Sequence, residues 1–152
     1  MKPLLRVHSD IMIVGGAMSF SLHADQRTRI IHVRAIGRVC EADVTDLRDR
    51  LNHEDTFVTG WPILCDCSAI AGLSISSSLI ESLAKTSRTR HNLVAIIAPR
   101  AVAFGLARMY QILSDPEYER IQLFAKTSEA KAWLNAGIKA TSLHERESHG
   151  LS

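Results

Sequence analysis

One uninterrupted apolar segment constrains the fold more than any other feature of the sequence. Residues 93 to 98 have the sequence Leu-Val-Ala-Ile-Ile-Ala. A strand with one face in water alternates polar and apolar residues, whereas a strand covered on both faces is apolar throughout. No apolar run in the chain approaches the length of about 18 residues that a membrane span needs. The segment therefore predicts a central strand of a sheet with helices on both faces.

Strands and helices alternate around this segment. The pattern opens with a hairpin, in which residues 19–23 and 28–36 pair across the polar turn Asp25-Gln26-Arg27. Apolar residues then recur at helical and strand periods in turn. We expect a helix over residues 41–52, a strand over 63–67, a helix after Ser76 or Ser77, the strand over 93–98, a helix after Pro99, a strand over 121–124 and a helix from residue 127 or 128 to Gly137. This order predicts an α/β fold with a mostly parallel mixed sheet of about five strands, opened by a β-hairpin, and four helices.

The alternating pattern also predicts the domain organisation. A chain of 152 residues has enough core for one domain and too little for two full ones. We expect a single α/β domain over residues 18–137, after a flexible lead-in over residues 1–17. Residues 138–152 have little apolar periodicity and are expected to form a loose C-terminal tail.

The cysteines and the charge balance limit the class of protein. Three cysteines without framework spacing do not make a secreted disulfide scaffold, so we expect reduced thiols and a cytoplasmic location. The apolar stretch Ile11–Met18 has only eight residues and no convincing cleavage site after it, which argues against a signal peptide. A net charge of +2 and 5% aromatic residues argue against specific nucleic-acid binding.

A polar, serine-rich segment is the richest candidate site. In parallel sheets, ligands bind beyond the carboxyl ends of the strands. The segment offers a phosphoacceptor serine or an anion pocket beside a helix N-terminus. The alternative is that the Asp66 carboxylate accepts N–H bonds in its own turn and that the serines which follow it cap the next helix. Capping is the commoner role of such serines. The candidate residues in this segment are Asp66, Ser68, Ser74, Ser76 and Ser77.

Charge is unevenly distributed along the chain. Residues 82 to 114 include no acidic residue, whereas residues 41 to 55 are rich in them. One interpretation is a basic surface, with Arg100 and Arg108 at its centre, for an anionic ligand, a lipid headgroup or an acidic partner protein. A second is self-association of the basic on the acidic face, as in a homodimer, and a third is two solvated helix faces. The basic residues of the segment are Lys85, Arg88, Arg90, Arg100 and Arg108.

Two cysteines flank Asp66 in the strand over residues 63–67. The period of two places Cys65 and Cys67 on the same face, away from Asp66. Zinc would need two further ligands, so we expect two buried, reduced thiols without metal. The sequence has no Gly-x-Ser-x-Gly elbow and no Gly-rich phosphate loop, so we expect neither an enzyme nor a cofactor. A hydrolase or transferase that uses Ser74 or Ser76 remains the third hypothesis.

Three stretches give the chain a resemblance to a known family. Leu64-Cys65-Asp66-Cys67-Ser68 is similar to the STAS strand that ends in Asp-x-Ser. The others are residues 94–99 followed by Phe104 to Tyr110, and Leu123-Phe124 followed by Glu129 to Leu134. From residue 20 to residue 137, the chain resembles the SpoIIAA-like proteins, which are related to STAS and SEC14-type domains.

The resemblance implies a compact domain that binds partners rather than catalyses. In sporulation regulators of this family a partner kinase phosphorylates a serine in an Asp-Ser-Ser-Gly segment. The corresponding residues here are Ser74-Ile75-Ser76-Ser77-Ser78, which lack the acidic residue and the glycine. The resemblance therefore implies a regulatory module that binds a protein partner or an anionic ligand. SEC14-type domains imply the alternative, a small carrier of a lipid or other hydrophobic ligand.

Overall fold

The structure of the protein is a computed structural model that describes residues 4–7, 10–13, 19–53, 60–86, 92–116 and 119–150. Its strands are β1 (Leu4–Val7), β2 (Asp10–Ile13), β3 (Phe20–Asp25), β4 (Ile30–Cys40), β5 (Ile63–Ser74), β6 (Asn92–Ile97) and β7 (Glu119–Phe124). Its helices are α1 (Glu41–His53), α2 (Ser77–Thr86), α3 (Ala101–Leu113) and α4 (Thr127–Gly150). Every predicted strand and helix is present in the predicted order.

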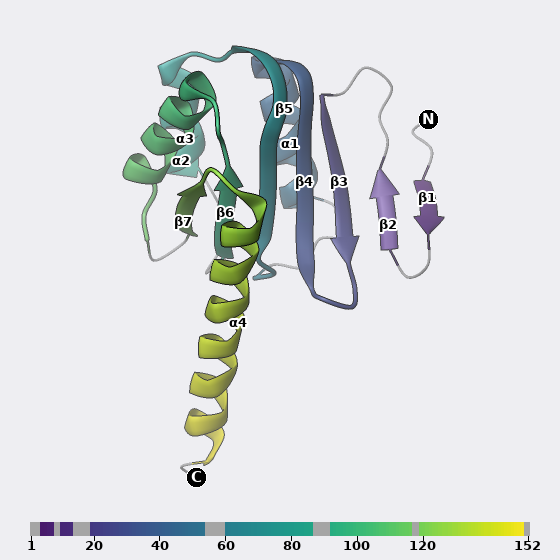
Figure 1. Cartoon of the computed structure of the whole chain (residues 1–152), viewed down its shortest axis with the longest axis vertical. Helices are drawn as coiled ribbons and strands as arrows, with labels where there is room; N and C mark the ends of the chain where they lie inside the picture. The colour runs from purple at the N-terminus through teal and green to yellow at the C-terminus, as the bar shows by residue number, and fades with distance from the viewer. Residues whose placement is uncertain are drawn as a thin grey trace.

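The described strands form one sheet in the order β1-β2-β3-β4-β5-β6-β7 (Figure 1). Strands β3 and β4 are the predicted hairpin and pair antiparallel, with Leu22 opposite Val33. Strands β4 to β7 pair in parallel. The α/β class, the hairpin that opens the mostly parallel strands β3–β7, and the four helices are therefore confirmed.

Strands β1 and β2 lie within the segment that the sequence predicts to be a flexible lead-in. Strand β2 pairs antiparallel with β3, and β1 pairs antiparallel with β2. The edge of β3 would otherwise present unpaired N–H and C=O groups, which an adjacent strand satisfies. The prediction for residues 1–17 is thus corrected at these two strands, which extend the sheet to seven strands.

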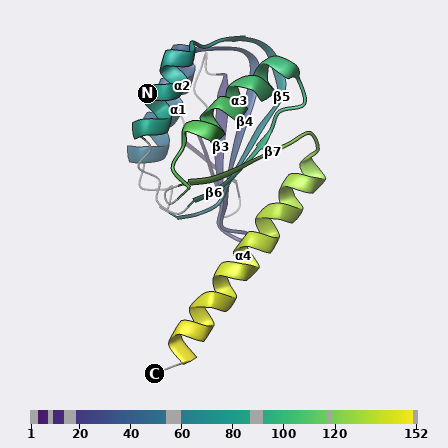
Figure 2. The same cartoon turned by 90° about the vertical axis from the view of Figure 1, so that its left-hand side faces the viewer.

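The helices cover both faces of the sheet. Figure 2 shows α1, α2 and α3 on one face and α4 on the other. Strands β4 to β7 are parallel and lie in sequential order, so right-handed crossovers place the helices that connect them on the same face. This accounts for the common position of α1, α2 and α3. On β6, Val94 belongs to the core under α1–α3, and Ala95 and Ile97 belong to the core under α4. The prediction that this strand is covered on both faces is confirmed.

Helix α4 is longer than the sequence predicts. Ala130 and Leu134 in its first half are fully buried against the sheet. Gly137 was expected to end the helix, but the helix continues to Gly150 and projects beyond the sheet (Figure 1). A Cβ at position 137 would overlap the side chain of Leu93, so this glycine allows close packing on β6 rather than marking a helix end. The prediction of a loose tail is corrected for residues 138–150.

Candidate functional site

The predicted site residues Asp66 and Ser68 lie in the middle of β5, at an irregularity of the sheet. The pairing of β4 with β5 shifts between Arg34 and Ile36, so that Arg34 pairs with Asp66 and Ile36 with Ala69. There, one oxygen of Asp66 accepts the backbone N–H of Ser68 at 2.9 Å and its hydroxyl at 2.6 Å. The carboxylate therefore bonds locally, as the alternative interpretation predicts, but it does so within β5. Because the strand continues to Ser74, the prediction that Asp66 lies in a turn beyond the strand end is wrong.

The serines at the end of β5 lie eight or more residues further along the chain than Asp66. Ser74 is the last residue of β5 and Ser77 is the first residue of α2. The hydroxyl of Ser76 accepts the N–H of Leu79 at 3.2 Å, which is N-cap geometry. The N–H of Ser76 donates to the Glu41 carboxylate at 3.0 Å. Hydrogen bonding from the Ser76 side chain and, to a lesser extent, from this N–H lowers the pKa of the Glu41 carboxyl. The capping interpretation is confirmed for Ser76.

The basic residues make local contacts with other parts of the chain. Arg100, just before α3, donates to the backbone oxygen of Ile70 at 3.0 Å. Arg108 donates to the side-chain oxygen of Gln111 one turn later. Lys85 forms an exposed ion pair with Glu81 at 2.7 Å. Arg88 and Arg90 lie outside the described residues. The structure thus places the two arginines of the predicted site on α3 and its approach, with bonds to neither Asp66 nor the serines.

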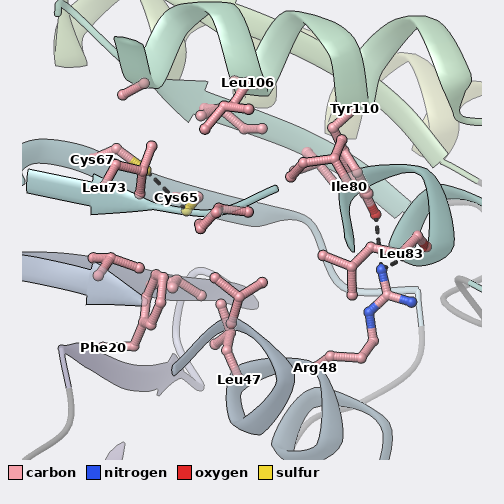
Figure 3. A pocket seen from close by; sticks show the side chains of 18 of the residues that line it. Phe20, Leu47, Arg48, Cys65, Cys67, Leu73, Ile80, Leu83, Leu106 and Tyr110 are labelled. Carbon is pink, nitrogen blue, oxygen red and sulfur yellow. Dashed lines mark hydrogen bonds between the residues drawn. The ribbon is translucent and has the colours of Figure 1, made fainter. Parts of the chain in front are cut away.

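A cavity of about 210 Å³ lies between the sheet and helices α1, α2 and α3. Figure 3 shows side chains from both layers pointing into it. Its walls are almost entirely apolar, because the inward-facing positions of β3–β6 meet the apolar stripes of the three helices there. The lining includes Phe20 and Leu73 from the sheet, Leu47 from α1, Ile80 from α2, and Leu106 and Ala107 from α3.

The two cysteines of β5 point into this cavity. Their sulfur atoms are 3.7 Å apart, so the prediction that both lie on the same face is confirmed. Both residues are half-buried, whereas Cys40 at the end of β4 is exposed. The hydrogen bond with Cys67 and the burial of its own sulfur raise the pKa of the Cys65 thiol well above its ordinary value. Cys65 is therefore protonated at neutral pH.

A polar group of side chains lies at another part of the cavity wall. The guanidinium of Arg48, on α1, donates to the backbone oxygen of Leu83 at 2.8 Å and to the hydroxyl of Tyr110 at 3.3 Å. These bonds link α1 to α2 and α3 across the cavity (Figure 3). Asn52 also contributes to the lining. Arg48 is the one charged side chain in the described lining.

Sequence reasoning did not single out Arg48. The helical period predicts an apolar stripe of Val44, Leu47 and Leu51 and places Arg48 off it, together with the acidic residues of that helix. The available signal was its spacing, because Arg48 is four residues after Val44 and three before Leu51, which places all three on one side of a helix. The structure confirms that Val44 and Leu51 line the same cavity as Arg48.

Comparison with known proteins finds similarity at the level of a solved structure. No protein-family model and no curated protein matches the chain. The crystal structure of an uncharacterised protein of the DUF3478 family from Shewanella loihica matches with a TM-score of 0.49 and 16% identity, over 88% of this chain and 92% of that one. That protein is described as having a SpoIIAA-like fold.

Two further findings concern the described residues only. Among them, no three side chains of histidine, cysteine, aspartate or glutamate gather in a group that could hold a metal ion. In the same part of the chain, every helix is too short or too polar to cross a membrane.

Proposed function

We propose that the protein is a non-enzymatic binding protein for a small, largely apolar molecule held between the sheet and helices α1–α3. The cavity of about 210 Å³ with apolar walls carries this proposal. Protein interiors are close-packed, and voids larger than a water molecule are few. An apolar cavity of about 150 Å³ is known to stay dry and to bind benzene, so this larger one has room for an organic ligand.

The composition of the lining supports binding over catalysis. Among the residues described there, no histidine and no carboxylate lines the cavity, and these side chains most often act as general bases. The function proposed here corresponds to the hydrophobic-ligand carrier. It departs from the regulatory module, for which the serine-rich segment is the candidate site.

Ligand binding is tested directly with a small apolar probe. p-Xylene at ten times its dissociation constant should stabilise the folded state by about 1.4 kcal/mol, which corresponds to about 3–6 °C in Tm for a domain of this size. It should also slow the reaction of Cys65 and Cys67 with a small thiol reagent, while the exposed Cys40 reacts as before. No shift in Tm and no protection of the two thiols would refute the proposal. Native mass spectrometry of the purified protein then identifies any ligand that it carries.

A second candidate function, a protein-binding surface, is favoured by the outer side of α3. Large apolar side chains are exposed there, with Val102 at 65%, Phe104 at 45% and Ile112 at 67% of their full accessible area. Arg108 lies on the same helix, so an acidic partner with an apolar patch would complement this surface. Replacing Phe104 and Arg108 with Ser and Gln should abolish capture of such a partner without loss of ligand binding in the cavity.

A further inference from the structure

We infer that Cys65 and Cys67 form a two-sulfur binding site for a trivalent arsenical that carries a single small apolar group, with that group held in the cavity between the sheet and helices α1–α3. This inference rests on the proposed function, because it uses the same cavity and names a ligand class for it. It is argued from the spacing of the two sulfurs, the ligands available around them and the apolar walls.

The two thiols are placed so that both can bond the same atom. Successive side chains of a strand point to opposite faces, so Cys65 and Cys67 share a face of β5, and both line the cavity. Their sulfur atoms are 3.7 Å apart (Figure 3). Two bonds of about 2.3 Å, the length of a zinc–thiolate bond, span that distance at an angle of about 107°. A linear ion between two thiolates would need sulfurs about 4.6 Å apart at that bond length, so the spacing favours a bent centre.

The number of available ligands limits the element. Among the described residues, no histidine, aspartate, glutamate or further cysteine joins the two thiols in a group that could hold a metal ion. Structural zinc sites and iron–sulfur clusters need four protein ligands, so two thiols provide neither. A trivalent arsenic with a single carbon substituent forms two further bonds, and two thiols supply both of them.

The walls of the cavity favour a neutral adduct with an apolar substituent. Arsenic bonded to carbon and to two sulfurs has no net charge, whereas a monovalent copper ion between two thiolates is an anion. Transfer of a charge from water into apolar surroundings is unfavourable. Leu73 and Leu106 are among the apolar side chains that line the same space as the two sulfurs. The cavity therefore suits an organic arsenical better than a bare ion.

The volume sets the size of the substituent. If a cavity of about 150 Å³ accommodates benzene, each non-hydrogen atom occupies about 25 Å³. The cavity of about 210 Å³ then holds about eight such atoms. A phenyl ring and its arsenic atom need the space of about seven, so phenylarsonous acid, which phenylarsine oxide forms in water, is a suitable probe.

Binding is a condensation in which arsenic stays trivalent. Cys67 reacts first, because a hydrogen bond with Cys65 lowers the pKa of its thiol and so raises the fraction present as the nucleophilic thiolate. Its sulfur forms a bond to arsenic, and a hydroxide leaves and departs as water with the proton of the thiol. The sulfur of Cys65 displaces the second hydroxide in the same way. Phenylarsonous acid and two thiols thus give a cyclic dithioarsonite and two molecules of water.

The test measures how the wild type competes with dithiothreitol for phenylarsine oxide and for its 4-carboxyphenyl analogue. Dithiothreitol has two thiols but no cavity, so the intrinsic reactivity of arsenic with sulfur cancels between the two reagents. We expect the wild type to prefer the phenyl reagent about tenfold or more, because the analogue would bring a carboxylate into apolar surroundings. Mass spectrometry should show Cys65 and Cys67 protected from alkylation by the bound arsenical, with the exposed Cys40 still reactive.

Variants separate the role of the sulfurs from that of the cavity. Cys65→Ser and Cys67→Ser each leave a single sulfur and should weaken binding about 100-fold or more, because the second bond of the chelate forms within one complex. Cys40→Ser is the matched control and should bind as the wild type does, since that thiol is exposed and lies outside the described lining of the cavity. Ala107→Leu keeps both thiols but fills part of the cavity, and should lose most of the preference for the phenyl reagent.

The outcomes separate this inference from the proposed function. Binding of p-xylene without binding of phenylarsine oxide would overturn the two-sulfur site and leave the apolar site. Equal affinity of the wild type for the phenyl and carboxyphenyl reagents would overturn the placement of the substituent in the cavity. Undiminished binding by Cys67→Ser would overturn the assignment of the sulfurs, and failure of both p-xylene and the arsenical would overturn both proposals. If the serine variants do not fold, the protection pattern of the wild type and the reagent preference of Ala107→Leu decide.

Discussion

Filling the cavity from α3 should stabilise the protein and abolish ligand binding together. Ala107 lines the cavity, and Ala107→Leu adds three carbon atoms at that wall. Each buried methylene contributes about 0.8 kcal/mol, so the upper limit of stabilisation is about 2.4 kcal/mol. Rotamer strain reduces this gain, and we expect a net increase of about 1–2 kcal/mol in the free energy of unfolding. For a domain of this size that is about 2–8 °C in Tm.

The same three carbons should exclude a ligand of about eight non-hydrogen atoms from a space that holds about that number. Urea unfolding followed by circular dichroism measures the stability, and the Tm shift with p-xylene measures the binding. Ala132→Leu is the matched control, since Ala132 lies on an exposed part of α4 and both quantities should stay unchanged there. A loss of more than 1 kcal/mol in Ala107→Leu with p-xylene binding retained would refute the position of the cavity.

Three further predictions test the fold and its caps. Ser76→Ala should lower the free energy of unfolding by about 0.5–2 kcal/mol in urea titrations because it removes the N-cap of α2, whereas Ser77→Ala should have a smaller effect. Ending the chain after Lys139 should reduce the helical circular dichroism signal but shift the Tm by less than about 5 °C, because residues 139–147 are exposed; a larger loss would show that this part of α4 is packed. The pKa of Glu41 is lowered in the folded state, so its contribution to stability is present above its ordinary pKa of 4.5 and is lost as the pH falls through the folded-state pKa. Glu41→Gln should therefore flatten the acid limb of the stability–pH curve, whereas the exposed control Glu129→Gln should not. An unchanged acid limb in Glu41→Gln would contradict the role of the hydrogen bonding between Glu41 and Ser76.

Local periodicity explains why most of the fold could be predicted. The apolar run from Leu93 to Ala98 forms a strand with packed side chains on both faces, because each face meets a different helical layer. The end of α4 could not be predicted in the same way. Gly137 is a common helix-ending residue, but its role here is a close contact with Leu93 in β6, which only the folded structure defines. Glycine thus serves both to end helices and to allow close packing between elements, and the sequence alone does not distinguish the two roles at position 137.

The candidate site was harder to predict than the fold for a related reason. The serines and Asp66 are conspicuous in the sequence. Asp66 proves to bond locally at an irregularity of β5, and Ser76 caps α2. The cavity depends on how far α1 and α2 stand from the sheet, and no spacing in the sequence encodes that distance. The paired thiols were correctly expected on one face of β5, but the space that they face could not be inferred from them.

The size of the cavity is itself an argument for a ligand. Protein interiors are close-packed, and voids larger than a water molecule are few, so a space of about 210 Å³ is well above an ordinary packing defect. Ala103 and Ala107 are the small side chains of α3 at this wall. At about 25 Å³ per carbon atom, Ala107→Leu would fill about a third of the volume. A chain that keeps alanine at both positions retains a space that a single substitution would reduce, which is consistent with an occupant that contributes the missing contacts.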